Sequence, residues 1–112
     1  MSERRWTLDT ARELLPDVRA RTARAVAEAE ALAEERALHA AGSAGLRGLD
    51  ERIEAVVTRW AREMEALGLE VKGLWLVDFD SGSGYYCWQW PEERLEFYHG
   101  YDEGFAGRAR IH

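Results

Sequence analysis

The feature that most constrains the fold is a change in the spacing of apolar residues at Gly68. Before Gly68, apolar and small residues recur every three or four positions, which is the spacing of one face of an α-helix. After Gly68, short aromatic and β-branched runs alternate with turn residues, a pattern typical of β-strands. The sequence therefore predicts an α+β fold, in which a long antiparallel helical hairpin packs with a three-stranded antiparallel β-meander.

The first predicted helix begins at Thr7, whose hydroxyl can cap the free amides of the first turn, while Trp6 packs onto Ala11. Pro16 removes a backbone donor early in this helix, so we expect a kink near residues 14–15. Gaps of three and four residues alternate along the helix and form a heptad seam of Leu8, Ala11, Leu15, Val18, Thr22, Ala25, Ala29 and Leu32.

The second predicted helix follows a loop at residues 39–45, in which Gly42 can take the left-handed position after the first helix. It ends at Gly68, and its apolar positions are Leu46, Leu49, Ile53, Val56, Trp60, Met64 and Leu67. The seam of the first helix is too long for the residues after Gly68 to cover. We therefore expect a homodimer, in which two hairpins pack into a four-helix bundle.

The three predicted strands occupy residues 74–79, 85–90 and 95–99, with turns at 80–84 and 91–93. Both alternate sets of residues in the first strand are largely apolar. One face of the sheet should therefore lie on the helices, and the C-terminal tail or a second subunit should cover the other. We expect one domain over residues 1–112, with the hairpin at 7–68 and the meander and tail at 69–112.

Composition narrows the classes of function. A net charge of −6 argues against a general nucleic-acid surface. No window approaches the ~18 apolar residues of a membrane span, and no apolar leader is visible, so a cytoplasmic protein is expected. The single cysteine, Cys87, fits a reducing compartment. Residues 1–24 carry six arginines against four acids, which indicates either solvated faces or an arginine-lined groove for an acidic ligand.

Several segments also resemble a known family. They are Thr7-Leu8 with Ala11, Leu14-Leu15-Pro16, Leu76-Val77-Asp78-Phe79, Cys87-Trp88, and His99 with the run from Gly104 to Arg108. Together they are similar to the bacterial domain of unknown function (DUF) family 2203, over nearly the whole chain. The resemblance implies an uncharacterised protein, and it brings no activity, cofactor or catalytic residue with it.

The first candidate site is a cluster around the predicted sheet. The first and third strands of a meander flank the second, so Asp78 and His99 can both approach Cys87, and Asp102 follows His99 closely. His99, Asp78 and Asp102 are candidate ligands of a transition metal such as zinc. His99, Asp102 and Cys87 are candidate catalytic residues of an acid/base enzyme.

Two other interpretations of this cluster stay open. Cys87 can be a small buried hydrophobe, while His99 and Asp102 form a hydrogen-bonded pair that ties the tail to the sheet. Haem with Cys87 or His99 as axial ligand is a further alternative.

The second candidate site lies in the tail. Arg108 offers a planar fork that can hold an anionic ligand over an aromatic floor of Trp88, Trp90 and Tyr86, provided that the tryptophans are exposed. Alternatively, Arg108 pairs with Asp78 or Asp102 of the same chain.

Two functions follow from these sites. The first is a dimeric, non-enzymatic module that binds a protein partner or a small ligand through the sheet and tail. The second is a small metal-dependent or acid/base enzyme that uses His99, Asp102, Asp78 and Cys87. The sequence leaves open whether the protein is an enzyme.

Overall fold

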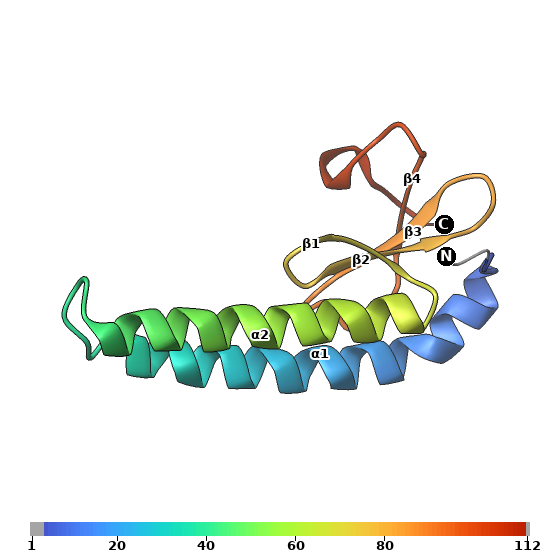
Figure 1. The fold of residues 1–112 in the computed structure, drawn as a ribbon. Helices are drawn as coiled ribbons and strands as arrows, with labels where there is room; N and C mark the ends of the chain where they lie inside the picture. The colour runs from blue at the N-terminus through green and yellow to red at the C-terminus, as the bar shows by residue number, and fades with distance from the viewer. Residues whose placement is uncertain (1–3, 112) are drawn as a thin grey trace.

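The computed structural model describes residues 4–111, and in that range the chain forms two long helices and one antiparallel sheet (Figure 1). The helices form a hairpin, and the strands follow one another across the sheet in sequence order. The elements are α1 (Leu8–Arg36), α2 (Ala44–Ala66), β1 (Glu70–Gly73), β2 (Leu76–Asp80), β3 (Tyr85–Gln89), β4 (Phe97–His99), the 3₁₀ helix η1 (Phe105–Gly107) and β5 (Ala109–Arg110). The predicted α+β class is confirmed.

The start of α1 follows the prediction. Thr7 is the N-cap, and it exchanges side-chain and backbone hydrogen bonds with Thr10. Figure 1 shows a bend in the N-terminal part of α1, the part that contains Pro16. Trp6 has a second role, because its amide donates to the Asp80 carbonyl at 2.7 Å and its ring meets Phe79 edge to face. The segment before α1 is thereby fixed to the sheet.

Most of the heptad seam is buried inside the hairpin, and Leu8 and Ala29 are partly buried. Because α2 runs alongside α1 (Figure 1), the chain itself covers the surface that was expected to remain open for a second copy. The homodimer stays a prediction, and the buried part of the seam is not available as its interface. The buried residues of the two helices are Ala11, Leu15, Val18, Thr22, Ala25, Val26 and Leu32 of α1, with Leu49, Val56, Trp60 and Met64 of α2.

The two helix ends differ in their use of glycine. Gly68 directly follows the C-cap of α2 and has a φ of 93°, as predicted for the residue that stops this helix. Gly42 also has a positive φ, of 78°. However, α1 already ends at its C-cap Ala37, so Gly42 shapes the middle of the loop and the prediction that it caps α1 is wrong.

The described part of the chain contributes five strands to the sheet, where three were predicted. The predicted strands correspond to β2, β3 and β4, and the missed strands β1 and β5 lie at the two edges. β1 reads Glu-Val-Lys-Gly, with a single apolar residue, and β5 has two residues, so neither carries an alternating apolar pattern. The start of the first predicted strand, Leu74-Trp75, is instead the turn between β1 and β2, where Trp75 has a φ of 59°.

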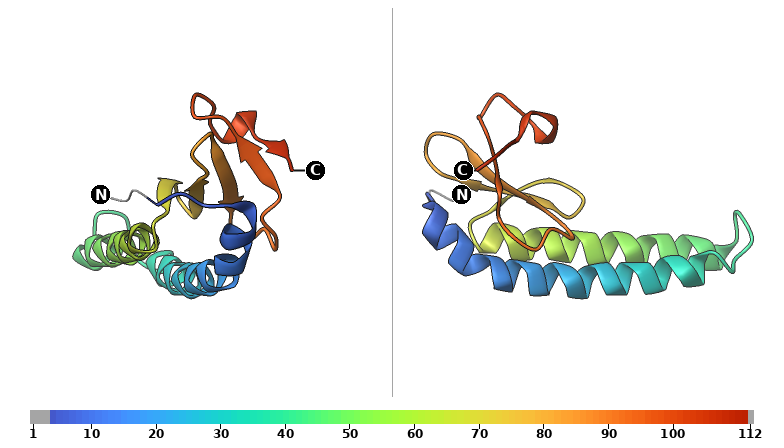
Figure 2. Two further views of the ribbon diagram at one scale, coloured as in Figure 1. Left: turned by 90° about the vertical axis from the view of Figure 1, so that its right-hand side faces the viewer. Right: turned by 180° about the vertical axis from the view of Figure 1, so that it is seen from behind.

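The two faces of the sheet have different neighbours. Val77, Phe79 and Trp88 are fully buried in the core formed with the helices. Alternation along the strands turns Asp78 and Cys87, which are directly paired between β2 and β3, to the opposite face. We refer to this as the outer face. The C-terminal tail crosses the sheet on the side away from the helices (Figure 2). The tail was one of the two expected covers of the outer face, and a second subunit was the other.

Arginines of α1 bind the connection between β3 and β4. Arg12 donates twice to the Leu95 carbonyl, at 3.1 and 3.3 Å, and Arg19 donates to the Glu92 carbonyl at 3.0 Å and lies over the Trp90 ring. These side chains are therefore committed to the fold, which contradicts the expectation of an arginine-lined groove for Arg12 and Arg19.

Neither described helix combines the length and the apolar character that a membrane span requires.

A buried hydrogen bond between the helices provides a test of the hairpin core. Trp60 Nε1 donates to Thr22 Oγ1 at 2.9 Å, and both residues are almost completely buried. Thr22→Val keeps the shape but removes the acceptor, so it should lower the free energy of unfolding by about 1–3 kcal/mol. Urea unfolding measures this. Glu34→Gln, at an exposed position of α1, should change it by less than about 0.5 kcal/mol. Equal costs at the two positions would contradict the prediction.

Candidate metal centre

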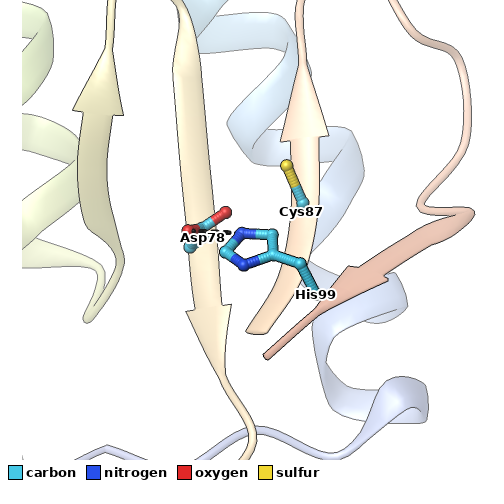
Figure 3. Close-up of side chains that lie close together, drawn as sticks. All are labelled: Asp78, Cys87 and His99. Atoms are coloured by element: carbon cyan, nitrogen blue, oxygen red, sulfur yellow. Dashed lines mark hydrogen bonds and ion pairs between the residues drawn. The ribbon is translucent and has the colours of Figure 1, made fainter. Parts of the chain in front are cut away.

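Three side chains with metal-binding atoms meet on the outer face of the sheet. Asp78 comes from β2, Cys87 from β3 and His99 from the end of β4, and one ligand atom of each lies within 4.8 Å of the others (Figure 3). Asp78 pairs directly with Cys87, and His99 pairs with Tyr85, which lies two residues from Cys87 on the same face. The expectation that the strand order brings Asp78 and His99 to Cys87 is confirmed.

Both ring nitrogens of His99 face oxygen acceptors. Nε2 lies 2.9 Å from Asp78 Oδ2, and Nδ1 lies 2.9 Å from the carbonyl oxygen of Gly100. A neutral imidazole has only one N–H, so it cannot donate to both acceptors. With a neutral imidazole and an ionised carboxylate, one of these two contacts would lack a donor hydrogen. A bound cation between the Nε2 lone pair and Asp78 would fill that gap.

The second oxygen of Asp78 has an unusual environment. Asp78 is 1% exposed, and its Oδ1 has no hydrogen-bond partner among residues 4–111. Burial raises the pKa of Asp78, while the nearby His99 and the Cys87 thiol act in the opposite direction. A buried carboxylate oxygen without a partner is costly, because the desolvation of its charge is not compensated. The Cys87 thiol also bonds Asp78, and a bound cation would compensate the charge more strongly than this weak donor does.

The Cys87 thiol is protonated at neutral pH. Burial, together with the charge of Asp78, raises its pKa to about 12, although Arg108 Nη1 lies 3.9 Å from Sγ and favours the thiolate. A catalytic cysteine needs a lowered pKa, so this thiol is not an activated nucleophile in the structure. A thiol of this kind loses its proton when a metal ion binds to the sulfur.

Asp102 does not join the three residues. It is exposed, and the carboxylate that binds His99 belongs to Asp78 of β2. The turn after β4 explains the difference, because the Gly100 amide donates to Glu103 at 2.8 Å and its carbonyl binds His99. This arrangement turns the chain outward at Asp102. The prediction that Asp102 pairs with His99 is therefore wrong.

Arg108 lies close to the site but binds a different acid from those predicted. Its Nη1 donates to Glu92 Oε1 at 3.1 Å, and its guanidinium lies over the rings of Phe97 and Phe105. The predicted pairing with Asp78 or Asp102 is therefore wrong. Glu92 also accepts from the Gln89 amide, so it links the tail to the end of β3. No short-range signal in the sequence indicates this role of Glu92.

The predicted aromatic floor is not an open surface. Trp88 is fully buried on the helix-facing side, and its Nε1 donates to the Glu92 carbonyl at 2.8 Å. Tyr86 and Trp90 are partly buried and pack against the same core. Tyr86 and Trp88 alternate with Cys87 along β3, so they point away from the face that Arg108 contacts. Arg108 and these rings therefore do not enclose one binding site.

These features define a small α+β protein with a buried aspartate, cysteine and histidine cluster on the sheet face that the helices leave free. A family model described as "Uncharacterized conserved protein (DUF2203)" matches residues 4–111, and the chain belongs to this family. The resemblance found in the sequence is thereby confirmed. The comparisons with curated proteins and with solved structures found no match.

The state of Cys87 can be tested by its reactivity. Because the thiol is buried and its pKa is raised to about 12, a chromogenic disulfide reagent should label the folded protein slowly at pH 8. We expect labelling at least about 100-fold slower than in the guanidinium-unfolded chain, measured by absorbance under matched conditions. Equal rates in the two states would show that Cys87 is accessible.

Proposed function

We propose that the protein binds one divalent transition metal ion of the zinc type through Asp78, Cys87 and His99. The observation that supports this most strongly is the convergence of three different ligand groups around an Asp78 oxygen that has no other partner among the described residues. A structural hydrogen-bonded pair would account for Asp78 Oδ2 and His99. A bound cation would in addition give Oδ1 a positively charged partner.

The chemistry of the donor set favours a particular group of metals. Thiolate and imidazole ligands select zinc, cobalt and copper over magnesium and calcium, which prefer oxygen ligands. Zinc binds sulfur, nitrogen and carboxylate oxygen at about 2.0–2.3 Å. The three ligand atoms already lie within 4.8 Å of one another, so small side-chain movements are enough to bring them around one ion.

The backbone of the tail orients His99 for this role. When Nδ1–H donates to the Gly100 carbonyl, the lone pair of Nε2 is directed toward Asp78 and the site. A metal-binding histidine usually donates its other ring N–H in this way to a carbonyl or a carboxylate. Gly100 thus supports the ring orientation that a metal ion would need.

Three protein ligands leave one position of a tetrahedral ion for water or a small ligand. Because all three side chains are buried, this fits a module that binds the ion itself, with water or a ligand of only a few atoms in the remaining position. Acid/base catalysis by His99 is less well supported, because the side chain is only 4% exposed and a substrate needs direct access to it.

Metal titration tests the proposal directly. Protein prepared with a chelator and then freed of it should bind Zn²⁺ with one ion per chain in isothermal titration calorimetry. Binding should release protons, because the Cys87 thiol loses its proton to the buffer when it becomes a metal ligand. With Co²⁺ in place of Zn²⁺, a thiolate-to-metal charge-transfer band should appear in the near ultraviolet and identify Cys87 as a ligand.

Substitutions separate this site from adventitious binding. Cys87→Ser and His99→Asn should each weaken Zn²⁺ binding by at least about 100-fold, and Cys87→Ser should abolish the charge-transfer band. Asp102→Asn, which changes a nearby exposed acid outside the cluster, should bind as the unmodified protein does. Circular dichroism checks that each variant is folded. Absence of stoichiometric binding, or equal binding by folded Cys87→Ser, would refute the proposal.

A further inference from the structure

The outward side of α2 carries a symmetric pattern of charges. Glu51 and Glu54 precede the bond between Val56 and Val57, and Arg62 and Arg59 follow it at the same distances. Two small residues, Ala55 and Thr58, are placed in the same symmetric way close to that bond. These six exposed residues line one shallow groove together with Glu63 and Ala66. When the sequence of α2 is read backwards from Arg62, the same pattern appears, but each acidic position is now basic and each basic position is acidic.

This side of α2 is not used by the fold. The buried residues of α2 are Leu49, Val56, Trp60 and Met64, and at 100° per residue they lie on the side opposite to Ala55 and Arg62. Figure 2 shows α1 on one side of α2 and the sheet above it, while no helix or strand of residues 4–111 lies on the remaining side. The groove is therefore open along the helix.

Most of the charges on this surface have no partner within residues 4–111. The side chains of Glu51, Glu54 and Arg62 make no hydrogen bond or ion pair there. Arg59 binds Glu28 of α1 at 2.7 Å, but its side chain is still 57% exposed. The surface thus offers both signs of charge, at positions related by a reversal of the helix direction.

We infer that α2 is the interface of a homodimer, in which it packs antiparallel against α2 of a second copy. A twofold axis beside the bond between Val56 and Val57 places Glu51 against the partner's Arg62 along the centre of the contact, and it places Glu54 and the partner's Arg59 at the same level on its two flanks. Each contact occurs twice because the interface is isologous. Ala55 and Thr58 lie at the centre, where small side chains let the two helices approach closely.

The charge pattern favours α2 of a second copy as the partner, and it favours an antiparallel over a parallel arrangement of the two helices. A parallel pairing in register would place Glu51 against the same residue of the partner, and Arg62 likewise, so that like charges would face each other. A partner of a single charge sign would satisfy only half of the surface. An antiparallel second copy matches both halves, and it does not involve the metal centre on the sheet.

The first test is the mass of the protein in solution. Analytical ultracentrifugation in the presence of a chelator, which excludes association through metal ions, should show a monomer–dimer equilibrium at low salt. The dimer should weaken at high salt, because its ion pairs are exposed and become screened. A protein that stays monomeric over the whole accessible concentration range would overturn the inference.

Charge reversal identifies the surface. Glu51→Arg/Glu54→Arg makes the groove positive, and Arg59→Glu/Arg62→Glu makes it negative, so each variant alone should dimerise at least about tenfold more weakly. Mixed in equal amounts, the two should form a heterodimer, which native mass spectrometry distinguishes by mass. Circular dichroism confirms folding, and all four positions are exposed. Self-association of either folded variant at the original strength, or failure of the mixture to pair, would overturn the inference.

Discussion

The alternation of side chains along β2 is the constraint on which the rest of the structure depends. Val77 and Phe79 point into the core shared with the helices, so Asp78 between them must point to the other face. A shift of one residue in the pairing of β2 would place the carboxylate in the apolar core and expose the two apolar side chains. The same register that buries the core thus sets the position of the candidate metal centre.

Much of the fold follows from local signals in the sequence. The long helical spacings, the Thr7 cap and the Gly68 stop predicted the hairpin, and the aromatic runs predicted the three central strands. The edge strands β1 and β5 have no such signal, because each is defined by hydrogen bonds to its neighbour and not by its own apolar pattern. Sequence spacing therefore describes the middle of this sheet better than its edges.

The candidate site was predicted only in part, for a similar reason. Strand order alone brought Asp78 and His99 to Cys87, since neighbouring strands in a meander are adjacent in space. The positions of Asp102 and Arg108 depend on the path of the tail, where Glu103 and Glu92 form hydrogen bonds that spacing does not reveal. The tryptophans were assigned to a ligand surface, but a chain of this size needs its large aromatic side chains for the core.

The hairpin extends well beyond the sheet, along the 48 Å long axis of the molecule (Figure 1). The loop at residues 37–43 lies at the far end, and none of the three cluster residues comes from either helix. Lengthening both helices by matching heptads would carry this loop outward and leave the sheet as it is. The hairpin is thus a spacer, and its length can change without moving the cluster of Asp78, Cys87 and His99 on the sheet.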